Sequence, residues 1–324
     1  VLTPEQEGKA TRVDIEVGFA LSGPLAQFGR SSFLQDIAQR MTDSFAANLS
    51  DRLDHAARGD AGDAPAPAQA AELNAAACRF ANALRSLQIE KGDRVAIYMP
   101  MIPETVVAVY GIYKAGAIAV PLFSGFAPDA VALRLNDVEA KAVVTADGYF
   151  RGGRAIRLQV ALGEALASVP TVTSVIVAER LGDGTSLQEG RDHLWSDLVK
   201  SQPAHFETVP MDSEDPAMVS YSSGTSGKPK GIVHVHGGLT VKLAEVGLFI
   251  YDTQPDDVSF MITDFGWMMG QLPMFSAHAV ASPLVIYEGS PLHPHPGRLY
   301  ELAEKYRISV FGAPATALRL LRTY

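Results

Sequence analysis

Short apolar runs alternate with helix-like stretches along most of this chain, and this rhythm restricts the folds open to it. Helices are predicted near residues 70–87 and 104–114, and strands at 94–98 and 119–123. Strands separated by helices are typical of parallel strands joined by crossover helices. We therefore predict an α/β fold with a layered parallel sheet.

The same pattern continues toward the C-terminal end. A helix is expected near Val235 and another near Pro296. The remaining predicted strands cover residues 142–145, 172–177, 217–221, 258–263, 284–287 and 308–311. The large α/β domain is thus predicted to extend from residue 70 to residue 324.

The first 57 residues follow a different pattern. Apolar residues alternate from Arg12 to Leu21, as in a half-buried strand, and recur every four residues from Phe33 to Leu53, as on one face of a long helix. One strand and one helix cannot close a core. Residues 18–30 together with this helix resemble the end of the G-subunit family of carbon monoxide dehydrogenase, which implies the last strand and helix of a helix-grip domain.

A connector separates these two regions. Residues 58–69 are rich in Ala, Gly, Asp and Pro, the composition of a flexible linker. We expect the chain to comprise segment 1–57, linker 58–69 and domain 70–324.

Composition and charge narrow the classes of function. The net charge of -9 provides no basic field for nucleic acid or anionic lipid. The single cysteine, Cys78, excludes an intramolecular disulfide, and no apolar run reaches the roughly 18 residues that a membrane span needs. We expect a cytoplasmic protein that contacts neither a membrane nor nucleic acid.

A loop rich in hydroxyls and glycines carries the clearest chemical signal. Residues 221–231 read Tyr-Ser-Ser-Gly-Thr-Ser-Gly-Lys-Pro-Lys-Gly and lie between a predicted strand and the helix near Val235. Glycines let backbone N–H groups approach phosphate oxygens, hydroxyls donate hydrogen bonds, and lysines neutralise charge. The spacing differs from that of the P-loop of NTPases. The predicted phosphate-binding residues are Ser222, Ser223, Gly224, Thr225, Ser226, Gly227, Lys228 and Lys230.

This loop is similar to the signature of adenylate-forming enzymes, which include acyl-CoA synthetases, luciferases and peptide-synthetase adenylation domains. Ser226 stands where that signature usually has threonine. From Ala71 to Tyr324 the chain resembles the front part of AMP-forming acyl-CoA synthetases, and acetyl-CoA synthetase in particular. The resemblance implies ATP with Mg²⁺, coenzyme A (CoA) and a small carboxylate as ligands.

Two further segments gain roles from the resemblance. Arg151-Gly-Gly-Arg154 is similar to a motif beside the phosphates of CoA, so Arg151 and Arg154 are implied as CoA ligands; a solvated turn is the alternative. Trp267 and Met269 lie in a segment similar to the passage for the acyl group and pantetheine. Met269 replaces a threonine and Leu292 an asparagine common in acetyl-CoA synthetases, which weakens the case for acetate.

Other reactive side chains receive structural interpretations. His234 and His236 would share a face of a strand, but no third metal ligand lies near them in the sequence, so we expect structural roles and no metal site. Cys78 lies among apolar residues on a predicted helix and is expected to be a buried, inert thiol. No residue is assigned as catalytic.

The resemblance also implies a reaction. A carboxylate attacks the α-phosphorus of ATP, and the thiol of CoA then captures the acyl-adenylate. Motifs expected to hold AMP, ribose and Mg²⁺, and a C-terminal domain with a catalytic lysine, do not occur before Tyr324. We therefore expect an incomplete ligase, inactive alone, with a missing C-terminal half or an oligomeric partner. The alternatives are a noncatalytic nucleotide-binding remnant and, least favoured, a small-ligand carrier built on segment 1–57.

Overall fold

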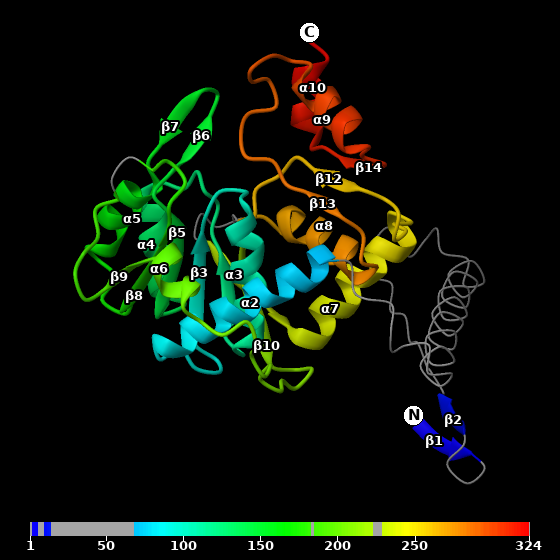
Figure 1. Cartoon of the computed structure of the whole chain (residues 1–324), viewed down its shortest axis with the longest axis horizontal. Coiled ribbons are helices and arrows are strands. Elements are labelled where there is room, and N and C mark those ends of the chain that lie inside the picture. The colour runs from blue at the N-terminus through cyan, green and yellow to red at the C-terminus, as the bar shows by residue number, and fades with distance from the viewer. Residues whose placement is uncertain (1, 6–9, 14–67, 183–184, 223–228, 324) are drawn as a thin grey trace. The chain divides into compact units, whose positions relative to one another are not determined.

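The structure is a computed structural model that describes residues 2–5, 10–13, 68–182, 185–222 and 229–323. The chain divides into two compact units, Val1–Pro65 and Ala66–Tyr324. In the first unit, β1 (Leu2–Glu5) and β2 (Ala10–Val13) form an antiparallel hairpin. The predicted strand at 12–21 overlaps β2 only in part, and its remainder and the predicted helix at 33–53 lie outside the described residues (Figure 1).

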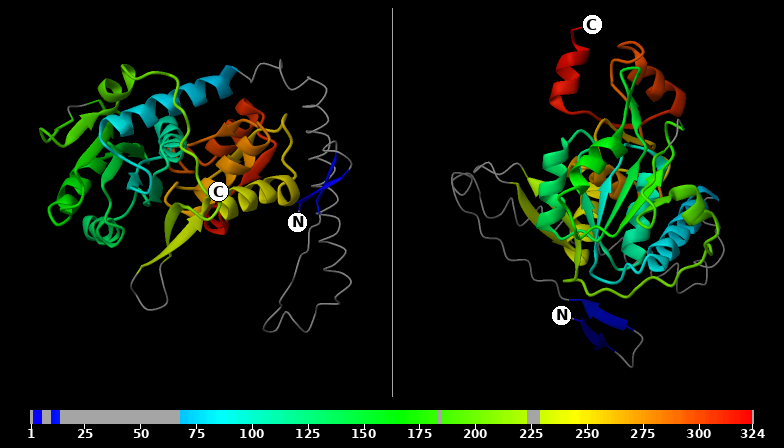
Figure 2. Two further views of the ribbon diagram at one scale, coloured as in Figure 1. Left: turned by 90° about the horizontal axis from the view of Figure 1, so that it is seen from below. Right: turned by 90° about the vertical axis from the view of Figure 1, so that its left-hand side faces the viewer.

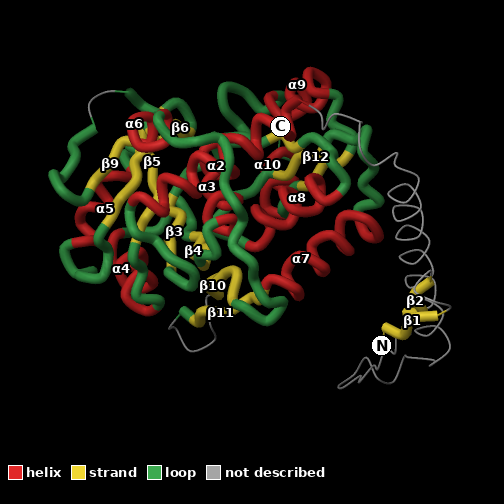
Figure 3. The backbone as a smooth tube through the Cα atoms, turned by 60° about the horizontal axis from the view of Figure 1, so that its bottom comes forward, coloured by secondary structure: helices red, strands yellow, loops and turns green. Residues whose placement is uncertain are grey.

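A seven-stranded sheet organises the second unit. Its strand order is β11-β10-β4-β3-β5-β8-β9, and Figure 3 shows the strands side by side. All neighbouring pairs are parallel except β10 and β11. The strands are β3 (Arg94–Tyr98), β4 (Ile118–Pro121), β5 (Ala142–Ala146), β8 (Ser174–Ala178), β9 (Asp192–Leu194), β10 (Pro216–Ser222) and β11 (Lys230–Val235).

Helices cover both faces of this sheet. In this order β4 lies on one side of β3, whereas β5 and then β8 lie on its other side. Right-handed crossovers therefore place the helix between β3 and β4 on one face of the sheet, and the helices between β4 and β5 and between β5 and β8 on the opposite face. Helix α2 packs on α3 and α6, and α4 packs on α5; Figure 2 shows cyan α2 well apart from green α4 and α5. The helices are α2 (Ala68–Ser86), α3 (Pro103–Lys114), α4 (Pro128–Asp137), α5 (Leu158–Leu166) and α6 (Trp195–Lys200).

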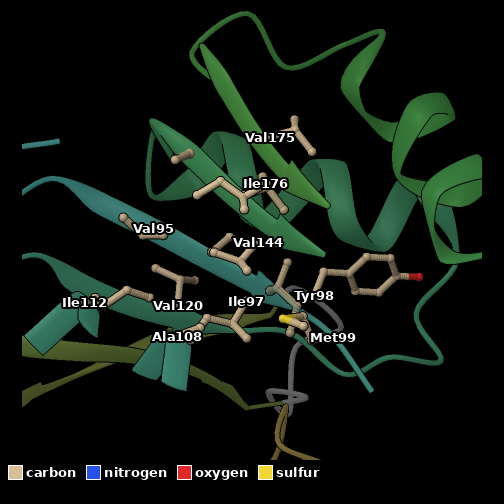
Figure 4. Close-up of a cluster of buried hydrophobic side chains, with 14 of the residues drawn as sticks. Val95, Ile97, Tyr98, Met99, Ala108, Ile112, Val120, Val144, Val175 and Ile176 are labelled. Atoms are coloured by element: carbon tan, nitrogen blue, oxygen red, sulfur yellow. The ribbon is translucent and has the colours of Figure 1, made fainter. Parts of the chain in front are cut away.

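The core lies between these helices and the sheet. Every residue of β4, β5 and β8 is buried, as expected for parallel strands covered on both faces. Figure 4 shows Val95, Ile97, Val120, Val144 and Ile176 in this cluster. Cys78 of α2 is also buried, at 2% exposure, as the sequence predicted.

The C-terminal part of this unit is built around a second, three-stranded parallel sheet. Its order is β13-β12-β14, and Phe260 packs there against Leu299 and Leu302. The elements of this part are α7 (His236–Glu245), the π-helical turn η3 (Val246–Ile250), β12 (Ser259–Met261), α8 (Met268–Ala279), β13 (Leu284–Val285), α9 (Arg298–Tyr306), β14 (Val310–Gly312) and α10 (Ala315–Leu321).

The predicted fold class is confirmed, with one local correction. The loop after β10 was expected to lead straight to a helix near Val235. Strand β11 instead returns antiparallel to β10, and α7 begins only at His236. The loop is therefore the connection of a β-hairpin, and His234 and His236 do not share a strand.

Candidate functional site

Several segments with hydroxyl or guanidinium side chains follow the carboxyl ends of parallel strands. Ser124 follows β4, the hairpin of β6 (Tyr149–Arg151) and β7 (Arg154–Ile156) follows β5, and Arg180 follows β8. Figure 1 shows β6 and β7 projecting beyond β5. Ligands of open α/β sheets bind at this edge, because the loops that join strands to helices gather there.

The phosphate-type loop begins at the end of β10. Ser222 is paired in register with Lys230, the first residue of β11, and these two residues mark the base of the hairpin. The other predicted phosphate ligands, Ser223, Gly224, Thr225, Ser226, Gly227 and Lys228, lie outside the described residues.

The strands below the loop are tied to their surroundings by side-chain hydrogen bonds. Ser220 Oγ and His234 Nε2 join β10 to β11 at 2.9 Å. Tyr221 donates its hydroxyl to Asp137 Oδ2 of α4 at 2.6 Å. Burial and this hydrogen bond raise the pKa of the Tyr221 phenol, so it stays protonated near neutral pH. The ends of β10 and β11 that carry the loop are therefore held in place by hydrogen bonds between side chains.

The two candidate CoA arginines flank a tight turn. Arg151 and Arg154 are paired across the β6–β7 hairpin, and Gly152 and Gly153 between them have φ values of 58° and 78°. Two successive positive φ values suit a type I′ turn, which glycine adopts without strain. Both arginines are exposed. The segment is therefore an exposed turn, and its two guanidinium groups are accessible to a phosphate.

Trp267 belongs to an aromatic cluster at the start of α8. Its ring centroid lies 5.3 Å from that of Phe123 and 6.2 Å from that of Phe126, both in the loop after β4. The Trp267 side chain remains 42% exposed and Met269 45% exposed. Large apolar side chains with this exposure offer a surface on which an apolar ligand chain can pack.

Asp264 holds this cluster in place. It accepts hydrogen bonds from the Ser124 hydroxyl (2.5 Å) and from the backbone N–H of Gly266 (2.8 Å). Burial raises the pKa of the Asp264 carboxyl, although these hydrogen bonds and the charge of Arg151 oppose the shift. Arg151 therefore interacts electrostatically with this carboxylate, and the backbone N–H of Trp267 donates a hydrogen bond to the main-chain carbonyl oxygen of the same residue at 3.2 Å.

A second buried carboxylate, Asp147, closes the end of β5. It accepts hydrogen bonds from the backbone N–H groups of Gly148, Arg180, Leu181 and Gly182. Burial alone would raise its pKa, but these donors prevail and lower the pKa of Asp147. The loops after β5 and β8 are consequently fastened together directly below the β6–β7 hairpin.

The histidines are embedded in packing contacts. His236 lies edge-on to Tyr113, with ring centroids 5.8 Å apart, and burial lowers the pKa of both His234 and His236. Both imidazoles are therefore neutral at pH 7. Within the described residues, no three His, Cys, Asp or Glu side chains are grouped so that they could hold a metal ion. Over the same residues, no helix is long and apolar enough to cross a membrane.

Sequence reasoning missed the residues that support the site. These residues all lie in loops after strands, and each forms a side-chain hydrogen bond with a residue more than a hundred positions away in the chain. They are Ser124 with Asp264, and Arg180 with Glu288. The sequence signal that could have identified them is their position just after a predicted strand. A carboxylate such as Asp264, which follows the predicted strand 258–263, lies at the edge of a parallel sheet where ligands bind.

The fold and the described parts of these loops define an α/β protein that places Ser222, Lys230 and the arginines of the β6–β7 hairpin at the carboxyl edge of a parallel sheet. Comparison with known proteins specifies the class further. The model of the AMP-binding enzyme family matches residues 62–324. The chain belongs to this family.

Three relatives illustrate the similarity. The acetyl-coenzyme A synthetase of Methanothrix thermoacetophila is 40% identical over 250 residues, which are 77% of this chain and 38% of the relative. That of Nostoc linckia is 34% identical over 287 residues, 88% of this chain and 85% of the relative. The solved acetoacetyl-CoA synthetase of Streptomyces lividans superimposes with a TM-score of 0.71 at 32% identity, covering 78% of this chain and 38% of that one.

The lengths of the matches differ. This chain spans about two fifths of the length of the Methanothrix thermoacetophila and Cronobacter sakazakii relatives, 38% and 39% respectively. It spans 85% of the shorter relative from Nostoc linckia. The family assignment therefore covers the α/β unit and not the whole length of the longer enzymes.

Proposed function

We propose that this chain supplies the nucleotide-phosphate and CoA binding part of an AMP-forming acyl-CoA synthetase. The observation that carries the proposal is the family match over residues 62–324, in which the hydroxyl- and lysine-rich loop directly follows the parallel strand β10. Such a loop suits the pyrophosphate portion of ATP, because backbone N–H groups, hydroxyls and ammonium groups all stabilise negative oxygens.

In this proposal the loop acts through charge and position. A carboxylate oxygen of the substrate attacks the α-phosphorus of ATP, the bond to the bridging oxygen breaks, and pyrophosphate leaves with that oxygen. Lys228 and Lys230, with the hydroxyls and glycines between Ser222 and Lys228, would hold the β- and γ-phosphates while this charge develops. Mg²⁺ would enter with ATP as part of the substrate complex, and the loop hydroxyls are oxygen ligands of the kind that it accepts.

The second half-reaction would use the hairpin and the aromatic cluster. The thiol of CoA attacks the carbonyl carbon of the acyl-adenylate, and AMP leaves. Arg151 and Arg154 would bind CoA phosphates by charge-assisted hydrogen bonds, and Trp267 with Met269 would line the passage of the pantetheine arm. The exposure of all four side chains supports these roles.

The activity and location of the chain belong to the same proposal. We propose that it does not complete adenylation alone and relies on a further polypeptide segment or partner for the remaining AMP and Mg²⁺ contacts. The cytoplasmic location, and the origin of residues 1–57 in a helix-grip domain of the carbon monoxide dehydrogenase type joined by linker 58–69, also remain proposals.

Ligand binding and turnover test different parts of the proposal. Calorimetry with ATP and Mg²⁺ should show binding that Lys230→Ala weakens by about tenfold, since a charge-assisted contact to phosphate is lost. Lys200→Ala, on α6 and outside the loop, is the matched control. Absence of binding would contradict the phosphate-loop assignment.

Turnover is measured with ATP, Mg²⁺, CoA and a panel of short carboxylic acids. ATP binding without pyrophosphate release is the expected result. Steady pyrophosphate release that depends on one of the acids would refute the incompleteness proposal and identify the substrate in the same experiment.

A further inference from the structure

The β6–β7 hairpin is too small to hold its own position. Each of its strands has three residues, and the two strands form a separate two-stranded sheet. Isolated two-stranded hairpins are marginally stable at best. The orientation of Arg151 and Arg154 must therefore depend on what the hairpin contacts.

Glu288 fastens the base of the hairpin. Its Oε1 accepts a hydrogen bond from the backbone N–H of Phe150 at 2.8 Å, and its Oε2 accepts one from Nε of Arg180 at 2.7 Å. The side chain of Glu288 is 9% exposed and that of Arg180 40% exposed. Screening by water is weak at such a buried carboxylate, so both hydrogen bonds are strong.

Arg180 contacts the same hairpin residue from a second side. Its guanidinium carbon lies 5.2 Å from the ring centroid of Phe150, within cation–π range. The backbone N–H of Arg180 donates to Asp147 Oδ1 at 2.8 Å, so this arginine is itself anchored to the end of β5. Glu288, Arg180 and Phe150 form a closed three-residue contact, which we call the clasp.

The tip of the hairpin rests on the segment that carries Glu288. A Cβ atom at Gly153 would lie 3.0 Å from the imidazole of His293, so the turn touches this ring. Tyr287 braces the segment by donating its hydroxyl to the carbonyl oxygens of Ser290 and His293 at 3.2 Å each. Residues 287–293 thus contact the hairpin at both its base and its tip.

We infer that Glu288 and Arg180 are positioning residues that hold the hairpin in the orientation in which Arg151 and Arg154 bind CoA phosphates. The inference rests on the proposed CoA role of these two arginines. The clasp acts through the hairpin, because its contacts are to Phe150, the residue next to Arg151 in β6.

CoA affinity, measured by calorimetry on the full chain, tests the positioning role. Glu288→Ala should weaken CoA binding by about tenfold, and Glu288→Gln, which keeps an acceptor for the Phe150 N–H, should weaken it less. Asp192→Asn is the matched control, since Asp192 is a similarly buried carboxylate paired with Arg191 at 2.6 Å. It should leave CoA affinity unchanged.

A double-mutant cycle separates positioning from general stability. In a chain that already carries Arg151→Ala and Arg154→Ala, Glu288→Ala should cause no further loss of CoA affinity, because the clasp has nothing left to position. An equal loss in both backgrounds would overturn the inference.

Trypsin cleavage after Arg151 and Arg154 reports on the hairpin without CoA. Glu288→Ala should accelerate this cleavage by about tenfold, whereas Asp192→Asn should not. If the arginine substitutions weaken CoA binding but Glu288→Ala changes neither affinity nor cleavage, the clasp inference is wrong. If the arginine substitutions leave CoA affinity unchanged, the proposed function fails and the positioning role fails with it, even where cleavage still shows that the clasp restrains the hairpin.

Discussion

Ser124 and Asp264 are 140 residues apart in the chain and are joined by a hydrogen bond of 2.5 Å from the serine hydroxyl to a carboxylate oxygen. The contact connects the loop after β4 with the turn before α8. It brings together two regions that the sequence marks only as separate strand ends, and it fixes the turn that carries Trp267.

The raised pKa of Asp264 predicts a loss of stability as the pH rises. A carboxyl whose pKa is higher in the folded than in the unfolded state binds its proton more tightly in the native protein. Its contribution to the free energy of unfolding is therefore complete below the unfolded pKa and is lost as the pH rises through the folded pKa. Asp264→Asn should remove this dependence. Urea unfolding at pH 4.5 and 7.5 should show that the wild-type chain loses more stability between the two pH values than the variant does. Equal losses would contradict the assigned direction.

Asp147 should behave in the opposite way. Its pKa is lowered, so its contribution is present above the unfolded pKa and is lost as the pH falls through the folded pKa. Asp147→Asn leaves one acceptor oxygen for four backbone donors and should cost about 2 kcal/mol at pH 7. The cost should shrink in urea unfolding at pH 3. If Asp147→Asn lowered the free energy of unfolding equally at both pH values, the packing of this side chain and not its charge would hold the two loops together.

Gly266 should not tolerate even a methyl group. A Cβ atom there would lie 2.1 Å from the backbone nitrogen of Phe123, and a backbone cannot move aside as a side chain can. Gly266→Ala should therefore destabilise the fold by about 2 kcal/mol or more and alter the fluorescence of Trp267. Gly163→Ala is the control, because nothing lies within 4 Å of its Cβ position on α5, and it should stabilise by up to about 1 kcal/mol.

The outer edge of β11 should promote self-association. Within the described residues β11 pairs with β10 alone, and it exposes Ile232 at 47% and Val233 at 57%. An exposed apolar edge strand is a template for pairing between chains, and a lysine blocks it. Val233→Lys should reduce concentration-dependent light scattering, whereas Val160→Lys, at the same 57% exposure on helix α5, should not. Similar effects of the two substitutions would indicate that net charge alone matters.

The central parallel strands were predictable because burial on both faces makes them continuous apolar runs. Strand β11 was not, since Lys230, Gly231 and His234 interrupt any apolar pattern and only pairing with β10 makes the segment a strand. The β6–β7 hairpin was hidden for a related reason. Its turn is visible as Gly152-Gly153, but three-residue strands carry no periodicity.

The candidate site was predictable where chemistry is local in sequence and not where it depends on distant contacts. The phosphate-type loop and the arginine pair each lie within eleven consecutive residues. Glu288 reaches Phe150 across 138 residues and Arg180 across 108, and no local pattern encodes such a pairing. The ligand-facing groups were therefore visible before the groups that orient them.

The burial of Cys78 gives this protein a built-in reporter. The sequence contains one thiol, and it is 2% exposed on a helix that packs against α3 and α6. An alkylating reagent can reach it only when that helix detaches, so the rate of labelling counts opening events of the α/β unit. Ligands that tighten the unit should slow labelling, and a single mass shift would record their binding without any engineered probe.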